Sequence, residues 1–278
     1  MQFRTQISIP KSNFPIDYNS KIMSLGSCFA ENISEKLDYF KFQNIVNPFG
    51  IIFNAISIER IIQRIVDQEL FTENDIFYHN ELWHCSEVHS SLSHPDKEQF
   101  IQNLNEILKL SHSQITKLSH FIITYGTSWV YRNLETNNIV ANCHKLPQKY
   151  FKKELLTLAK TEKSIENTIS LIHSINKNVK FVLTVSPVRH IKDGFVENNV
   201  SKSVLLQTIY ILLQTEHYKL NIEYFCSYEI ILDELRDYRF YKPDMLHPNE
   251  IAVNYVWLKF VESSISSASF FTMNQVEN

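Results

Sequence analysis

Short apolar runs alternate with longer stretches of helical periodicity along most of the chain. The runs are rich in β-branched and aromatic residues, and a glycine, proline or asparagine follows most of them closely. A run of this kind is typical of a strand that is buried on both faces of a parallel sheet. The pattern predicts strands at Ile22–Leu25, Gln43–Val46, His120–Tyr125, Lys180–Val185 and Ile222–Phe225.

Between these runs, apolar residues recur at spacings of three and four, as they do on one face of a helix. Phe100, Leu104, Ile107 and Leu108 show this spacing before the third predicted strand. Alternating strands and helices indicate an α/β fold with a parallel sheet and right-handed crossovers. The predicted helices cover Ala30–Tyr39, Ile56–Gln68, Lys97–Leu110, Thr161–Ile175, Val200–Leu213 and Pro248–Ser263.

Length and composition are those of an enzyme-sized folded domain. The chain has 278 residues, of which 44% are apolar and 21% are charged, and this composition excludes disorder. The formal net charge of −3 provides no basic field that would favour nucleic acid. We expect one domain over residues 1–278, in which the polar, histidine-rich segment Phe71–Pro95 forms a lid or an excursion from the sheet.

The cysteines are Cys28, Cys85, Cys143 and Cys226, and no two of them form a CxxC pair. Reduced thiols are therefore expected, and neither a disulfide framework nor a zinc site. Residues 1–15 lack the charged start and apolar core of a signal peptide, and no apolar run is long enough to span a membrane. We expect a cytoplasmic protein with neither a membrane nor a nucleic acid as partner.

Polar or glycine-containing turns follow four of the five predicted strands. In open parallel sheets, ligands bind at the carboxyl ends of the strands, so these turns are where chemistry is expected. They are Gly26–Cys28, Asn47–Gly50, Gly126–Trp129 and Ser186–His190.

Two further patterns suggest catalysis by groups from opposite ends of the chain. A sharp strand-to-helix turn at Ser27 and Cys28 would expose a small nucleophilic side chain at the sheet edge. Asp244 and His247 are three residues apart, and an Asp at this spacing can orient the His as a base. The structural alternative is that Ser27 and Asp244 cap helices, Cys28 is a small buried residue and His247 lies on the surface.

Several ordered stretches resemble one family. The run GSCFA at residues 26–30 gives the GSCFA-domain family its name, and the resemblance covers roughly residues 20–260. It implies membership of the SGNH, or GDSL-like, hydrolases, which are mostly esterases and acyltransferases with a three-layer α/β/α sandwich and a five-stranded, flavodoxin-like parallel sheet. The other similar stretches are NPFGIIFN (47–54), GTSWVY (126–131), NCHK (142–145), TVSPVRHIKDG (184–194), ELRDYRFY (234–241) and DMLHP (244–248).

The resemblance implies catalytic roles for the two-ended pattern. Cys28 falls in the position of the superfamily nucleophile, and Ser27 is the alternative. A thiol is a good acyl acceptor when a helix N-terminus and a nearby His lower its pKa, which we expect of Cys28. His247 would be the general base, and Asp244 would hold its tautomer.

The resemblance also implies an oxyanion hole, in which Gly50 matches the superfamily's glycine. The superfamily block Gly-x-Asn-Asp reads Gly-Thr-Ser-Trp here, so its Asn is absent. Ser128, Asn142 or His144 would replace it as a donor. Substrate-binding residues are expected at Gly126, Trp129, His144, Arg189 and His190.

The guanidinium of Arg189 suits a carboxylate, a phosphate or a sugar hydroxyl, and the alternative is an ion pair with Asp193. The spacing of His84, His89, His94 and His144 matches no metal signature, so neither a metal nor another cofactor is expected.

These implications favour an esterase or O-acyltransferase acting on a carbohydrate or another hydroxylated small molecule. The expected cytoplasmic location favours transfer, with acyl-coenzyme A as a candidate donor. The missing Asn supports the alternative of a non-catalytic ligand-binding domain, and no oligomeric state is predicted.

Overall fold

A five-stranded parallel sheet forms the centre of the computed structural model, which describes residues 5–216 and 221–277. Its order is β10-β9-β5-β1-β2. The chain passes from β1 to the edge strand β2 and then to β5 on the other side of β1, so the topological switch point lies between β1 and β5. The strands are β1 (Lys21–Gly26), β2 (Gln43–Val46), β5 (His120–Tyr125), β9 (Lys180–Val185) and β10 (Ile222–Tyr224).

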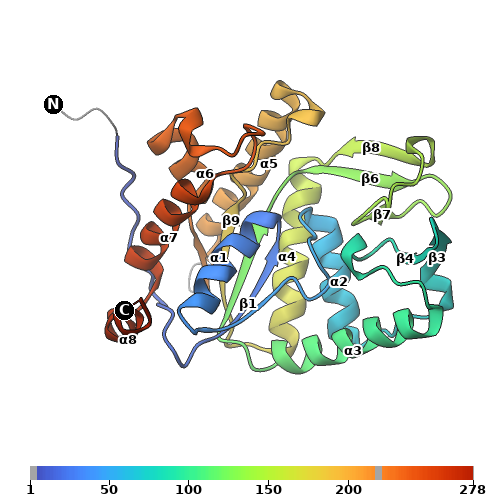
Figure 1. Ribbon diagram of the computed structural model, residues 1–278, viewed down its shortest axis with the longest axis horizontal. Helices are drawn as coiled ribbons and strands as arrows, with labels where there is room; N and C mark the ends of the chain where they lie inside the picture. Colours follow the sequence, from blue (N-terminus) through green and yellow to red (C-terminus); the bar gives the residue numbers. More distant parts are fainter. Residues whose placement is uncertain (1–4, 217–220, 278) are drawn as a thin grey trace.

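Successive residues of the central strands β1, β5 and β9 enter two separate apolar cores. Met23 and Leu25 of β1 belong to one core, whereas Ile22 belongs to the other. The first core includes α2 (Ala55–Asp67), α3 (Lys97–Ile115), α4 (Leu158–Ile175) and α5 (Phe195–Gln214). The second includes α1 (Cys28–Tyr39) and α7 (Glu250–Ser264) on the opposite face (Figure 1). This arrangement confirms the predicted α/β fold and its three layers.

The predicted elements lie where the pattern placed them, with some boundaries shifted. All five predicted strands are present, and α5 begins earlier than predicted, at Phe195. The last long helix begins at Glu250, and Asn249 is its N-cap, accepting from Ala252 N. Shorter segments complete this region: α6 (Ser227–Glu229), a π-helical turn (Ile230–Leu235) and the terminal helix α8 (Phe270–Glu277).

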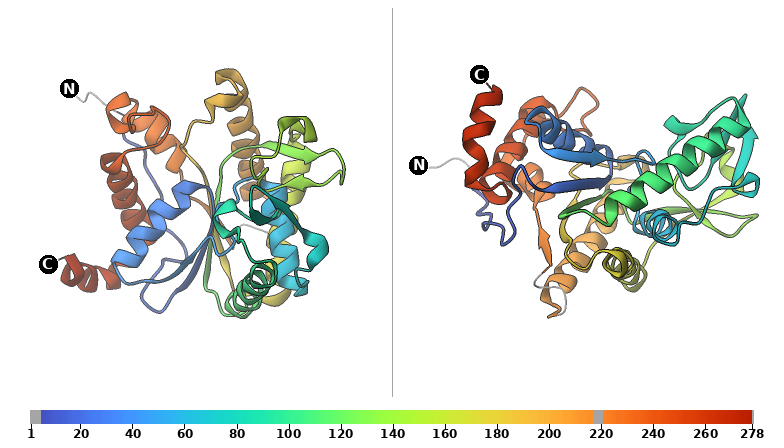
Figure 2. Two further views of the ribbon diagram at one scale, coloured as in Figure 1. Left: turned by 45° about the vertical axis from the view of Figure 1, so that its right-hand side comes forward. Right: turned by 90° about the horizontal axis from the view of Figure 1, so that it is seen from below.

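Two antiparallel additions extend one end of the molecule, opposite α8 (Figure 2). The first is a hairpin of β3 (Ile76–His79) and β4 (Leu82–Cys85). The second has the order β7-β6-β8. Its strands are β6 (Trp129–Asn133), β7 (Ile139–Val140) and β8 (Phe151–Leu155).

The expected lid or excursion, Phe71–Pro95, contains the hairpin and is bound to α2. Arg64 of α2 is fully buried, and its guanidinium contacts Asp75 at 2.8 Å and Glu87 at 2.7 Å. Breaking a buried, hydrogen-bonded ion pair of this kind strongly destabilises the folded protein. We therefore regard the segment as an excursion that is fixed to the domain.

None of the helices in the described part of the chain is both long enough and apolar enough to cross a bilayer.

Candidate active site

A cavity of about 380 Å³ opens at the carboxyl ends of the parallel strands. It brings together residues from the turns after β1, β5 and β9 and from the loop before α7. The strand β6 forms a further wall through Trp129, Val130 and Tyr131. Among the lining residues are Ser27, Cys28, Thr127, Arg189, His190 and His247.

The turn after β1 is held in a conformation that requires glycine. Gly26 has φ +135°, and a Cβ atom there would lie 2.1 Å from the carbonyl oxygen of Thr124. The Gly26 amide donates to Asn47 Oδ1 at 2.9 Å, which ties the end of β1 to the turn after β2. Only glycine tolerates this approach of two backbones, so the sharp turn places the next two residues at the sheet edge.

Ser27 and Cys28 have different tasks in this turn. Ser27 is 2% exposed and is the N-cap of α1, and its Oγ accepts a hydrogen bond from Phe29 N at 3.2 Å. This is the structural role considered for Ser27. Cys28 is only partly buried, begins α1 and lines the cavity. The thiol is therefore the more available nucleophile of the two.

The protonation of Cys28 differs from the expectation of a lowered pKa. Burial raises the pKa of the thiol, and the carboxylate of Glu31 raises it further. Lys242 and Lys202 act in the opposite direction but do not reverse the shift. The expected lowering was wrong because the thiol is desolvated and has an acidic neighbour on the first turn of α1. Cys28 is therefore a neutral thiol at rest.

Asp244 and His247 form a hydrogen-bonded pair at the mouth of the cavity. His247 Nδ1 lies 2.7 Å from Asp244 Oδ2, and Asp244 Oδ1 accepts from the amides of Leu246 and His247 at 2.8 and 3.0 Å. These hydrogen bonds lower the pKa of Asp244 to about 2, so its carboxylate can only accept. Nδ1 must therefore carry the proton, which leaves Nε2 of a neutral imidazole as the basic nitrogen.

The side chain of Asp244 does not cap the last helix, because Asn249 does so. The His247 side chain is 40% exposed, and the residue lines the same cavity as Cys28. The loop that carries Asp244 and His247 is also bound to the turn after β9, since the Arg189 amide donates to the carbonyl of Leu246 at 3.2 Å. The structure thus brings the two ends of the chain together.

Arg189 and His190 follow β9, and both line the cavity. The ring of His190 stacks on Phe53 at 5.7 Å between centroids, and its Nε2 is buried without a hydrogen-bond partner in the described structure. Burial, assisted by the charges of Lys202 and His247, lowers the pKa of His190 to about 3. His190 is therefore a neutral imidazole with an unsatisfied nitrogen at the site.

One face of α5 holds two of the turns that form the cavity. Asn198 Oδ1 accepts from the His190 amide at 2.8 Å, and Ser201 Oγ accepts from the Ser128 amide at 2.7 Å. Lys202 Nζ donates to the carbonyls of Gly126 and Ser186 at 2.5 and 2.6 Å. The sequence interpretation missed this set of polar residues. Their spacing, i, i+3 and i+4, was the available signal, because it places them on one face of a helix.

Lys202 carries an unusual charge environment beneath the cavity. Burial lowers the pKa of its amine to about 7, and the Arg189 guanidinium adds to the lowering, whereas the Cys28 side chain opposes it. Lys202 and Cys28 therefore act on each other electrostatically, with the amine favouring the thiolate form of Cys28.

The residues expected in the oxyanion hole do not line the cavity. The Gly50 amide donates to the Asn47 carbonyl at 2.7 Å. The Ser128 hydroxyl donates to the Ser201 carbonyl at 3.0 Å, and Asn142 Oδ1 accepts from the His144 amide at 2.8 Å. These contacts commit the Gly50 and Ser128 donors to neighbouring groups, and we do not carry the three expected roles forward.

Two of the expected substrate-binding residues also lie outside the lining. Gly126 donates its amide to the Phe53 carbonyl at 2.8 Å and leaves no space for a Cβ beside Phe53. His144 is buried, and its Nε2 is 2.7 Å from the Cys85 carbonyl. Trp129 does line the cavity, with Arg189 and His190.

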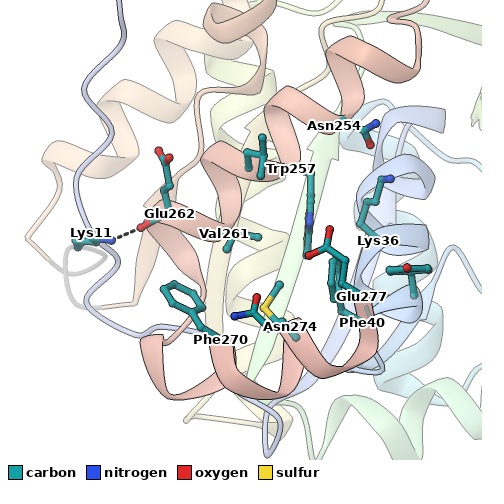
Figure 3. Close-up of a pocket in the computed structure, with 13 residues that line it drawn as sticks. Lys11, Lys36, Phe40, Asn254, Trp257, Val261, Glu262, Phe270, Asn274 and Glu277 are labelled. Atoms are coloured by element: carbon teal, nitrogen blue, oxygen red, sulfur yellow. Dashed lines mark hydrogen bonds between the residues drawn. The ribbon is translucent and has the colours of Figure 1, made fainter.

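No cluster of three or more metal-binding side chains of the kinds His, Cys, Asp and Glu occurs within the described residues. A larger cavity, of about 670 Å³, lies elsewhere, between α1, α7 and α8 (Figure 3). Trp257 and Phe40 line it with lysine and glutamate side chains at its edges. Its lining includes neither a cysteine nor a histidine, so it lacks the chemistry of the smaller cavity.

A family model gives the same assignment as the sequence resemblance. The model of the GSCFA family matches residues 21–260, which include every residue that lines the candidate active site with Cys28 and His247. The chain belongs to the GSCFA family. No curated protein matches this GSCFA chain, so the chemistry of the site is argued from its geometry.

Proposed function

We propose that this GSCFA protein is an acyl esterase or O-acyltransferase that works through Cys28, His247 and Asp244. One observation carries the proposal: a thiol and a carboxylate-oriented imidazole line a single cavity at the carboxyl ends of the strands. A nucleophile beside a base that a third group orients is the usual arrangement for covalent acyl chemistry. The strand order and the two-ended site support placement among SGNH-type hydrolases by analogy.

The chemistry begins with a neutral thiol, because burial raises the pKa of Cys28. His247 Nε2 takes the thiol proton as the Cys28 sulfur forms a bond to the carbonyl carbon of the acyl group. His247 then returns the proton to the departing alcohol or donor thiol, which leaves an acyl thioester on Cys28. Water completes hydrolysis, or the hydroxyl of an acceptor completes transfer, again with His247 as base.

Asp244 keeps the His247 imidazole in the correct tautomer during this cycle. Its carboxylate stays ionised because three hydrogen bonds stabilise the charge, so it stabilises the imidazolium that forms on His247. The positive end of α1 lies at Cys28, and the dipole there would stabilise a developing oxyanion. We propose a hydroxylated small molecule, such as a carbohydrate, as the acyl acceptor or ester, with acyl-coenzyme A as a candidate donor.

The test is trapping of the covalent intermediate. The protein is incubated with 4-nitrophenyl acetate, quenched in acid and mapped by peptide mass spectrometry. The expected result is one acetyl group on the peptide that begins α1, located at Cys28, with release of 4-nitrophenol. His247→Ala should slow acetylation, and Cys28→Ala should abolish it.

Ser27→Ala is the matched control, because it removes the adjacent hydroxyl but keeps the thiol. Acetyl on Ser27 in the wild-type protein would move the nucleophile to the capping residue. No acetyl on either residue, with tight binding of an ester analogue, would favour the second candidate, a non-catalytic binding domain. The neutral thiol and the occupied donors of Gly50 and Ser128 are the observations that favour this second candidate.

A further inference from the structure

A second cavity of about 540 Å³ adjoins the candidate active site. Arg189, Ile191 and Leu246 line both cavities. Arg189 comes from the turn after β9 and Leu246 from the loop that carries His247, and a backbone hydrogen bond of 3.2 Å joins them. A ligand with one end beside Cys28 could therefore extend past Arg189 into the second cavity.

Two arginines, Arg189 and Arg236, line the second cavity. In the described structure, Arg236 has a carboxylate partner and Arg189 has none. Four charged residues line this cavity, and Asp233 contacts Arg236 at 3.7 Å. The other carboxylate, Asp237, contacts Arg239 at 3.1 Å. Each of these acids is thus already compensated by an arginine close to it in the sequence.

The alternative partner of Arg189 considered from the sequence, Asp193, is also occupied. Its carboxylate forms an ion pair with Lys153. The guanidinium of Arg189 donates one long hydrogen bond, 3.3 Å, to Asn199 Oδ1, and its Nε is buried without a partner in the described structure. A buried, unsatisfied guanidinium nitrogen is costly unless a ligand satisfies it.

The rest of the second cavity is aromatic and apolar. The rings of Tyr238 and Tyr241 lie 6.1 Å apart at an interplanar angle of 49°. Phe195 and Met245 are also exposed there, at 66% and 49%. Exposed aromatic side chains that gather around one cavity suit the flat face of a ring and are typical of ligand sites.

We propose that Arg189 binds an anionic group, a carboxylate or a phosphate, on the substrate, and that the ring attached to this anion occupies the second cavity. The planar guanidinium provides a paired set of donors that matches both kinds of anion. The inference rests on the proposed function for the statement that the acyl group lies beside Cys28. Recognition of the anion does not depend on turnover, so the anion site and the proposed acyl chemistry can be disproved separately.

The experiment measures binding to the full chain by isothermal titration calorimetry with three probes of one shape: 1-naphthyl phosphate, 1-naphthoate and neutral 1-naphthol. We expect at least one anionic probe to bind about tenfold or more tightly than 1-naphthol. The two anions distinguish a phosphate site from a carboxylate site. Arg189→Met should remove the preference for the anion, and Arg189→Lys should restore it only in part, because an ammonium lacks the planar pair of donors.

Arg236→Met is the matched control, since Arg236 lines the same cavity but is exposed and paired with Asp233. It should retain the anion preference of the wild-type protein. Equal binding of 1-naphthol and both anions would overturn the proposal, as would an equal loss in Arg189→Met and Arg236→Met. Anion binding that persists in Cys28→Ala, whether or not 4-nitrophenyl acetate acetylates the wild-type protein, supports the subsite independently of the acyl chemistry.

Discussion

The amine of Lys202 donates a hydrogen bond of 2.5 Å to the carbonyl oxygen of Gly126. It donates a second one, of 2.6 Å, to Ser186. Gly126 and Ser186 are the first residues after β5 and β9, so a single side chain of α5 joins two of the turns that form the cavity. Lys202 is 1% exposed, and water cannot easily replace these contacts. We infer that the shape of the site depends on this buried amine.

Lys202→Met is predicted to destabilise the protein. The change keeps the apolar stem of the side chain but leaves two buried carbonyl oxygens without their donor. Loss of a buried partner costs about 1–3 kcal/mol, so the free energy of unfolding, measured by urea titration at pH 9, should fall by about this amount or more. Lys192→Met changes an exposed lysine that lines the cavity, and it should alter the free energy of unfolding by less than about 0.5 kcal/mol. Equal urea midpoints for the wild type and Lys202→Met would contradict the prediction.

The same pair of proteins should show a defined pH dependence. The amine of Lys202 has a pKa of about 7 in the folded protein against 10.5 for an ordinary lysine. Between these values the unfolded chain binds more protons than the folded chain, so stability rises with pH. The stability advantage of the wild type over Lys202→Met should therefore grow as the pH rises from 7 to 10. An advantage that stays constant or shrinks over this range would show that the amine is charged in the fold.

Cys28 and Cys85 should differ in reactivity towards iodoacetamide. Cys28 is partly exposed in the cavity, whereas Cys85 is fully buried and burial raises its pKa to about 12. Because the thiolate is the reactive species, labelling of Cys28 should be slow at pH 7 and rise up to about tenfold per pH unit above it. Peptide mapping of a time course would follow both sites. Fast labelling of Cys28 at pH 7 would show that the thiol is activated at rest, contrary to its desolvated position.

The sequence predicted those features of the fold that depend on local pattern. The apolar runs gave the central strands β1, β5 and β9, because a strand buried on both faces needs apolar residues at nearly every position. The edge strands β2 and β10 were also predicted, although most of their residues are not buried. The small strands β6, β7 and β8 were missed. β7 has only two residues, and β6 and β8 carry polar residues such as Arg132 and Lys152, so neither alternation nor a continuous apolar run marks them.

The candidate site was predictable only in part, for a different reason. Cys28 could be placed at the sheet edge because it follows a parallel strand directly. His247 lies in the loop before α7, and only the Asp-x-x-His pattern and the family resemblance suggested that it meets Cys28. The hydrogen-bond partners of individual side chains could not be predicted from the sequence. Ser128 is engaged by Ser201, 73 residues along the chain, and no local pattern around Ser128 indicates that contact.

Asp244→Asn tests whether His247 depends on an orienting carboxylate. The amide of Asn can present its NH₂ group to Nδ1, which would stabilise the tautomer that carries its proton on Nε2 and cannot act as base. By analogy with the serine-protease triad, we expect the acyl-transfer rate on 4-nitrophenyl acetate to fall by up to about 10⁴-fold. The fold should persist, because Asp244 is an exposed loop residue whose side-chain contacts are within its own turn.

Asp193→Asn is the control for this change, since it alters a carboxylate that lines the cavity and pairs with Lys153 and not with His247. Its rate should stay close to that of the wild type. An Asp244→Asn protein with an unaltered rate would mean that His247 acts without an orienter, and the 2.7 Å contact between the two residues would then be structural only. A rate that falls in both variants alike would instead point to the overall negative charge of the cavity, because the two substitutions remove the same charge and share no hydrogen-bond partner.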